Sequence, residues 1–166
     1  MKIVDVRCIP LASPQSGRNY LIIKVETDEG LYGIGESGII GKELAVQGVI
    51  EHFRPMLIGE DSSRIEFIWQ RLYRGGFFKG AQIQTAAISA VDLALWDIRG
   101  KALGLPVYEL LGGRCRDKAV CYPHVSGETL EEFLDDAGRA LDEASSSGCM
   151  RSRRMMASST RATRSR

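Results

Sequence analysis

Three polar residues near the N-terminus, two of them cationic, have side chains that can hydrogen-bond to an anion. Arg18 and Asn19 directly precede a segment of strand-forming residues, and Lys42 follows in a second loop. A guanidinium can pair with a carboxylate through two parallel hydrogen bonds. The alternative for Arg18 and Asn19 is an ordinary solvated loop. For Lys42 the alternative is the first turn of a helix, where the ammonium faces water.

His124 is the fourth candidate, and it follows Tyr122-Pro123. Its imidazole can hydrogen-bond to a hydroxyl or a carboxylate. A lone histidine is more often structural, so the residue type alone leaves both interpretations open.

The elements that must position these residues begin with strands. Apolar and polar side chains alternate along residues 2–8. Residues 20–27 (YLIIKVET) are rich in β-branched and aromatic side chains. Asp28-Glu29-Gly30 is a turn signal, and LYGIG follows it, so residues 20–36 are expected to form a hairpin. The sequence therefore predicts a three-stranded antiparallel meander.

Helices are expected after the meander. Residues 42–53 and 63–73 carry apolar stripes that would bury one face each (Ala45, Val49, Ile50 and Phe53; Ile65, Ile68, Trp69 and Leu72). A longer helix is predicted by helical spacing of Ile83, Ala87, Ala90, Val91, Ala94 and Ile98. Pro106 marks the start of a short helix, and Gly112-Gly113 marks its end. Strands followed by helices predict the α+β class.

This order of elements resembles the N-terminal capping domain of the enolase superfamily, in the mandelate racemase and muconate lactonizing enzyme branch. The resemblance rests on the run AxxAxxxALWDIxGKxxGxPxxxLLGG, which ends at Gly113. It implies a capping domain over residues 1–124, whose last part, residues 117–124, is a strand leading out of the cap.

Within the superfamily the chain is most similar to acid-sugar dehydratases, particularly mannonate dehydratase. The similar segments are GRNY ending at Tyr20, TDEGLYGIGE ending at Glu36, GKELAV, YRGG and the Tyr-Pro-His motif. Mannonate dehydratases carry a substrate-binding asparagine where this chain has Ile40, and an aspartate in place of Glu36. Galactonate dehydratase, which has a similar YRGGF segment, remains the alternative.

The resemblance implies a lyase reaction in carbohydrate-acid metabolism. A barrel domain holds magnesium, a base removes the proton next to the substrate carboxylate, and water is lost. In this chain it assigns substrate contacts to His124, Arg18, Asn19 and Lys42. It assigns no catalytic residue and no metal ligand, since both belong to the barrel.

A complete barrel takes roughly 200 residues or more, and this chain has 166. Residues 125–144 predict one amphipathic helix that would link the cap to the barrel (Leu130, Phe133, Leu134, Ala137, Leu141). We therefore expect a truncated dehydratase that is itself inactive, so whether the chain is an enzyme stays open. The alternatives are a non-catalytic interaction domain derived from the cap, or the cap of a racemase or cycloisomerase.

Residues 145–166 differ in composition from the rest of the chain. They contain six of its 22 basic residues and none of its 21 acidic ones, so the preceding part has 16 basic and 21 acidic residues. Because apolar residues do not recur at helical or strand spacing in this tail, we expect it to be disordered. Its two interpretations are a frameshifted ending and a basic arm for nucleic acid or membrane, and the first is favoured because the tail begins where a barrel strand is expected.

The expected partner is a sugar acid, bound by the full-length family, with neither specific nucleic acid nor membrane. The family resemblance implies a homo-oligomer for full-length members, while the oligomeric state of this chain stays open.

No apolar run approaches the ~20 residues that span a bilayer, and no signal peptide is visible, so a cytoplasmic location is expected. The four cysteines lack metal-site spacing and are expected to be apolar filler.

Overall fold

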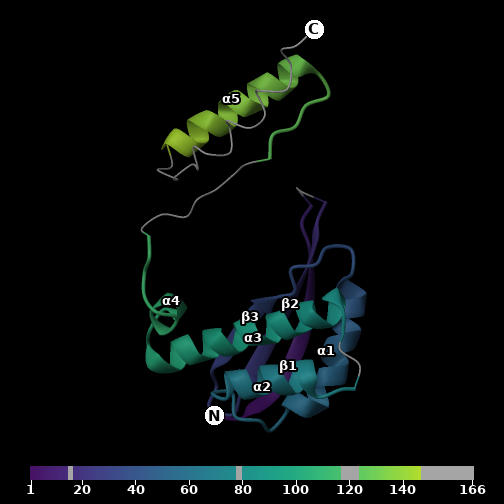
Figure 1. Cartoon of the computed structure of the whole chain (residues 1–166), viewed down its shortest axis with the longest axis vertical. Coiled ribbons are helices and arrows are strands. Elements are labelled where there is room, and N and C mark those ends of the chain that lie inside the picture. Colours follow the sequence, from purple (N-terminus) through teal and green to yellow (C-terminus); the bar gives the residue numbers. More distant parts are fainter. Residues whose placement is uncertain (15–16, 78–79, 117–123, 147–166) are drawn as a thin grey trace. The chain divides into compact units, whose positions relative to one another are not determined.

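The computed structural model describes residues 1–14, 17–77, 80–116 and 124–146 (Figure 1). The chain divides into two compact units, Met1–Gly113 and Arg114–Arg166. The predicted strand at 117–124 lies outside the described residues except for His124, and the predicted tail lies outside them from residue 147 onward. The domain boundaries at 124 and 144 therefore stay predictions.

Three strands form one antiparallel sheet in the order β1 (Ile3–Ala12), β2 (Asn19–Thr27) and β3 (Tyr32–Glu36). The predicted meander is confirmed. Strand β1 continues past the predicted end at Cys8 because it keeps pairing with β2 as far as Ala12 opposite Asn19. Pro10 is tolerated there because β1 is an edge strand, where a missing N–H leaves no ladder bond unmade.

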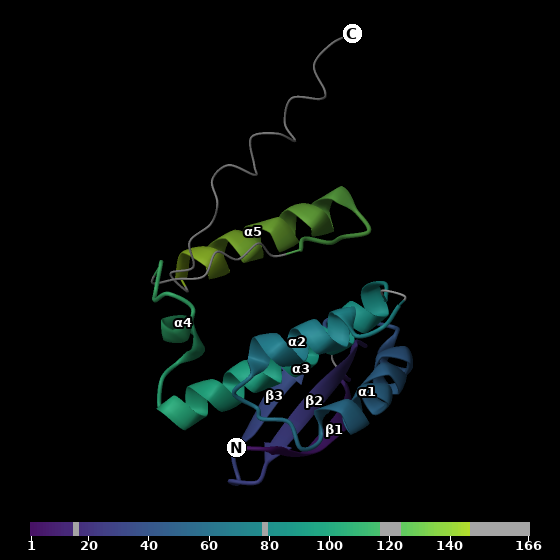
Figure 2. The same cartoon turned by 60° about the horizontal axis from the view of Figure 1, so that its bottom comes forward.

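One face of the sheet is covered by helices α1 (Glu43–Leu57) and α3 (Gln82–Leu103), and α2 (Ile65–Arg74) packs on α3 (Figure 2). The fourth helix of this unit, α4 (Val107–Leu110), follows Pro106 as expected. The core lies between the sheet and α1 and α3. Its largest fully buried side chains are Ile3, Leu21, Ile23, Ile50, Leu57, Ile88, Leu95 and Ile98.

Two predictions about α1 were wrong. The helix was expected to end at Phe53, but it continues through Pro55 to Leu57. Leu57 is 1% exposed, and its burial holds the last turn in place although proline removes one helical hydrogen bond. Ala45 was expected to be buried and is exposed, because it lies at the border of the buried stripe rather than within it.

Helix α3 approaches the backbone of β3 closely at two glycines, Gly33 and Gly35. A methyl group built on Gly33 would come within 1.9 Å of the Ala94 carbonyl oxygen, and one built on Gly35 within 1.9 Å of the Ala90 oxygen. The alanines of α3 thus meet glycines of the strand, which explains why small residues stand at these positions of both elements.

The second unit contains helix α5 (Leu130–Ser146), close to the predicted helix. Its start has a reciprocal cap, because the Thr129 hydroxyl accepts from the Glu132 N–H at 3.2 Å and the Glu132 carboxylate accepts from the Thr129 N–H at 3.3 Å. The apolar residues Leu130, Phe133, Leu134 and Leu141 are exposed. None of the described helices has the length and apolar character needed to cross a bilayer.

Candidate functional site

One end of the sheet gathers three of the four candidate residues. Strand β2 begins at Asn19 and β3 ends at Glu36, which pairs with Ile22. Because the two strands are antiparallel, the start of β2 and the end of β3 lie at the same end of the sheet. The loop that follows β3 leaves from this end, and the Ser37 N–H still donates to the Leu21 carbonyl at 3.1 Å.

Arg18 and Asn19 lie where the β1–β2 hairpin enters β2. The Ser13 N–H donates to the Arg18 carbonyl at 2.8 Å, and the Gly17 N–H donates to the Ser13 carbonyl at 2.9 Å. Gly17 has a φ of 63°, in the left-handed region that favours glycine. Arg18 and Asn19 are both exposed, so their side chains are accessible to a ligand.

Lys42 occupies the last position before α1 and is exposed. The loop that leads to it turns at Gly38 and Gly41, with φ values of 66° and 74°. The Gly41 N–H donates to the Glu43 carboxylate at 2.7 Å, which fixes the entry into the helix. Ile40, in the same loop, is 56% exposed. The position of Lys42 at a helix start agrees with both of its predicted interpretations.

His124 belongs to the second unit and is exposed, in a stretch without regular secondary structure. The structure therefore brings Arg18, Asn19 and Lys42 to one end of the sheet, and it does not place His124 with them. The assignment of all four to substrate binding stays a prediction.

A groove at this end of the sheet was missed by the sequence reasoning. It has a volume of about 620 Å³ and lies between the loop at Ser37 and the first two turns of α3, including Thr85 and Ser89. A signal for it was present, because Gly33, Gly35 and Ser37 are small residues at every second position. Such spacing indicates a strand face that a neighbouring element approaches closely.

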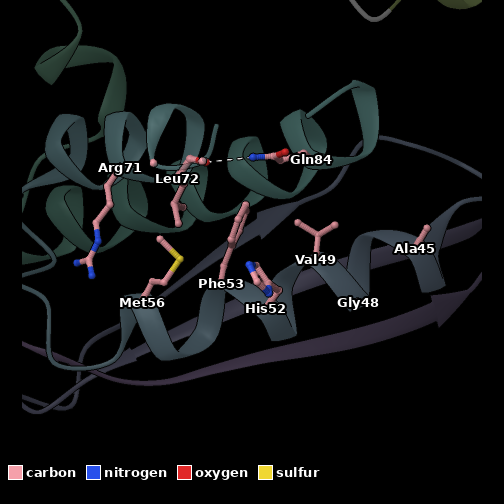
Figure 3. A pocket seen from close by; sticks show the side chains of 11 residues that line it. Ala45, Gly48, Val49, His52, Phe53, Met56, Arg71, Leu72 and Gln84 are labelled. Atoms are coloured by element: carbon pink, nitrogen blue, oxygen red, sulfur yellow. Dashed lines mark hydrogen bonds between the residues drawn. The ribbon is translucent and has the colours of Figure 1, made fainter. Parts of the chain in front are cut away.

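A second hollow, of about 420 Å³, lies between α1, α2 and the start of α3 (Figure 3). The Gln84 amide donates to the Leu72 carbonyl at 3.1 Å, and Arg71 forms an ion pair with Glu60. Two polar groups of this hollow are therefore already engaged within the domain, which leaves them poorly suited to bind a ligand.

Burial displaces the pKa values of two titratable groups among the described residues, and both groups lie away from the candidate residues. Burial raises the pKa of the Cys8 thiol to about 11, with a further contribution from Glu51. Burial also raises the pKa of the Asp92 carboxyl, and Glu66 adds to this. The described residues contain no group of three or more His, Cys, Asp or Glu side chains that could hold a metal ion.

A family model described as "Mandelate racemase / muconate lactonizing enzyme, N-terminal domain" matches residues 9–112. The chain belongs to this family. Its predicted membership of the enolase superfamily and its α+β capping-domain fold are thereby confirmed. An enolase from Pantoea ananatis, whose crystal structure holds D-gluconate and Mg, superposes with a TM-score of 0.79 at 42% identity, over 86% of this chain and 34% of that one.

The similar proteins of this family include named dehydratases. The chain is 48% identical over 143 residues to a D-mannonate dehydratase of Rhizorhabdus wittichii, covering 86% of this chain and 35% of that protein. It is 46% identical over 128 residues to the D-galactonate dehydratase family member RspA of Halomonas elongata, covering 76% and 32%. The chain thus spans about a third of the length of these relatives.

Proposed function

We propose that this family member serves as the cap of a sugar-acid dehydratase, in which it covers the substrate while a barrel domain performs the chemistry. The observation that carries the proposal is the match of residues 9–112 to the family model, together with relatives named for D-mannonate and D-galactonate dehydration. The coverage of about a third supports the view that the catalytic residues belong to a part outside this chain.

In this proposal the end of the sheet with Arg18, Asn19 and Lys42 faces the substrate. All three side chains are exposed, and two of them are cations. Cations in a site shielded from water attract the carboxylate of a sugar acid more strongly than they do in bulk solvent. His124 contributes a hydrogen bond to a substrate hydroxyl or carboxylate.

The proposal assigns magnesium to the barrel, because the described residues offer no cluster of metal ligands. A divalent cation there would stabilise the negative charge that develops when the proton next to the carboxylate is removed. The 166-residue chain would then bind sugar acids weakly and would not dehydrate them.

A chimera tests this function directly. Residues 1–140 of this chain replace the corresponding segment of the Rhizorhabdus wittichii D-mannonate dehydratase, which is 48% identical over 143 residues. We expect the chimera to dehydrate D-mannonate or D-galactonate in the presence of magnesium, and the 166-residue chain to show no turnover. A folded chimera that turns over neither acid would contradict the proposal.

A further inference from the structure

Helices α2 and α3 form a hollow that the candidate site does not use. It has a volume of about 430 Å³, and its lining includes Glu66, Trp69, Asp92 and Trp96. We propose that this hollow binds the guanidinium group of an arginine that belongs to the barrel domain of the dehydratase. The identity of this partner rests on the proposed function, whereas the hollow is defined by the described residues alone.

The spacing of these residues along the two helices brings them together. Glu66 and Trp69 are about one turn apart on α2, and Asp92 and Trp96 are about one turn apart on α3, so each pair shares one helix face. Because α2 packs on α3, both pairs line the same hollow (Figure 2). The two indoles are partly buried, and the rest of each ring is accessible to a partner.

Asp92 is a partly buried carboxylate that lacks a counter-charge. It makes no hydrogen bond and no ion pair with any residue that the structure describes. Burial and the neighbouring Glu66 raise its pKa, so the folded chain disfavours its ionised form. A group that costs stability in the folded state is typical of a binding surface, and a cation in the hollow would supply the missing partner.

The other charged groups of the hollow do not neutralise Asp92. The Glu66 carboxylate accepts a hydrogen bond from the Gln70 amide at 2.6 Å, which leaves its negative charge in place. Arg74 also lines the hollow, but it is exposed and forms no ion pair with either carboxylate. The lining therefore has an excess of negative charge, which complements a cationic side chain.

The two indoles favour a guanidinium over an ammonium. A guanidinium is planar, stacks on aromatic rings and can donate two hydrogen bonds to one carboxylate, whereas an ammonium is a strongly hydrated point charge. Trp69 stacks on Tyr73 with ring centroids 4.9 Å apart, which holds its indole in position. An arginine side chain therefore matches both the charge and the aromatic lining of the hollow.

The length of the relatives indicates the source of this arginine. The chain covers 35% of the D-mannonate dehydratase of Rhizorhabdus wittichii, so the proposed cap must rest on a larger part of the protein. An acidic group without a partner destabilises the cap alone. The same group is stabilised when an interface provides an opposite charge.

The indole N–H signals report directly on this hollow, because Trp69 and Trp96 are the two tryptophans of the chain. N-acetyl-L-arginine amide, titrated into the 166-residue chain at constant ionic strength, should shift both NMR signals. N-acetyl-L-citrulline amide, which has a neutral urea in place of the guanidinium, should shift neither. Equal shifts by both compounds, or no shift by the arginine compound, would overturn the inference. Equally tight binding of N-acetyl-L-lysine amide would overturn the preference for a guanidinium.

Asp92→Asn separates binding from folding. It should raise the unfolding temperature of the isolated chain at pH 7, because it removes the unpaired carboxylate, and it should abolish the shifts caused by N-acetyl-L-arginine amide. Asp135→Asn on α5 removes the same charge elsewhere and should change neither property. Binding that is retained in Asp92→Asn would exclude this carboxylate from the site and overturn the inference.

The chimera tests whether the barrel domain supplies the arginine. There Asp92→Asn should lower the unfolding temperature, opposite to its effect in the isolated chain, because it leaves a buried guanidinium without its partner. Equal stabilisation of the chimera and the isolated chain would overturn the inference. If that chimera still dehydrates D-mannonate, the proposed function is sustained without the arginine contact. An inactive chimera that shows the reversal would sustain the contact and contradict the proposed function.

Discussion

The Asp97 carboxylate accepts a hydrogen bond from the Ile34 backbone N–H at 3.0 Å, which joins α3 to the open edge of β3. The Lys101 ammonium donates to the same carboxylate and to the Tyr32 carbonyl, both at 2.8 Å. These two side chains therefore satisfy a donor and an acceptor that β3 presents away from β2. An edge strand covered in this way cannot pair with a strand from another molecule at these positions.

Replacement of Asp97 should expose this edge. Asp97→Ala leaves the exposed Ile34 N–H without its partner and Lys101 without its counter-ion, so we expect a loss of about 0.5–1.5 kcal/mol in the free energy of unfolding. Denaturant unfolding measures the loss, and light scattering over a range of concentrations measures the increased self-association. Arg99→Ala on the same helix is the control. If the two variants behave alike, the contact to Ile34 contributes nothing specific.

Replacing each of two glycines by alanine should change the stability of the domain in opposite directions, because only one of them lies where α3 approaches β3 closely. Gly35→Ala would place a methyl group 1.9 Å from the Ala90 carbonyl oxygen, so the helix must move, at a cost of about 1–3 kcal/mol or more. Gly48→Ala, within α1, meets nothing within 4 Å and should stabilise the domain by about 0.5–1 kcal/mol. Thermal unfolding of both variants measures the difference. A tolerated Gly35→Ala would show that α3 can shift at little cost.

Much of this architecture could be predicted from the sequence. Alternation and β-branched residues located the strands, and helical spacing located α3, because these periods follow directly from backbone geometry. The end of α1 was missed because Pro55 is a local signal, whereas the burial of Leu57 that overrides it is a property of the packed core. The pairing that extends β1 to Ala12 is likewise set by β2 and not by β1 alone.

The candidate site was only partly visible in the sequence. Arg18, Asn19 and Lys42 were selected by residue type and resemblance. The hairpin places Arg18 and Asn19 at one end of the sheet, and the loop after β3 leads from that end to Lys42. The Ser37 groove escaped because its features are a buried hydroxyl and a set of backbone N–H groups. The burial of Ser37 depends on the helix that covers the strand, which its own residue type does not reveal. Backbone N–H groups are present in almost every residue, so no residue type marks them. The small residues at Gly33, Gly35 and Ser37 were the available clue.

The raised pKa of Asp92 predicts that the stability of the domain depends on pH. Burial, with a contribution from Glu66, raises the pKa of this carboxyl in the folded state, so the fold favours the protonated form. The stabilisation is complete below the ordinary pKa of an aspartate and is lost as the pH rises through the raised value. Asp92→Asn should therefore raise the unfolding temperature by a few degrees at pH 7, and this difference should disappear near pH 3. Asp135→Asn, on exposed α5, should show neither effect. A variant that is no more stable than the parent at pH 7 would mean that Asp92 ionises there without cost.

The substrate-binding assignment can be tested residue by residue in the chimera. Loss of one hydrogen bond to a charged group costs roughly 1.5–3 kcal/mol, which is about one to two powers of ten in affinity. His124→Ala, Arg18→Ala and Lys42→Ala should each raise KM for the sugar acid within this range. Their magnesium dependence should not change, because the proposal assigns the metal to the barrel. Arg64→Ala, at the start of α2 and away from this end of the sheet, is the matched control.

Ile40→Asn tests the same assignment by adding a hydrogen-bonding group instead of removing one. It introduces an amide into the loop after β3, where Ile40 is 56% exposed and has space for a polar group. If the cap covers mannonate, the added hydrogen bond should lower KM for D-mannonate about tenfold relative to D-galactonate. Competition assays with both acids measure this ratio in a single reaction. An unchanged ratio, or one that shifts toward D-galactonate, would indicate that the isoleucine belongs to a cap adapted to a different sugar acid.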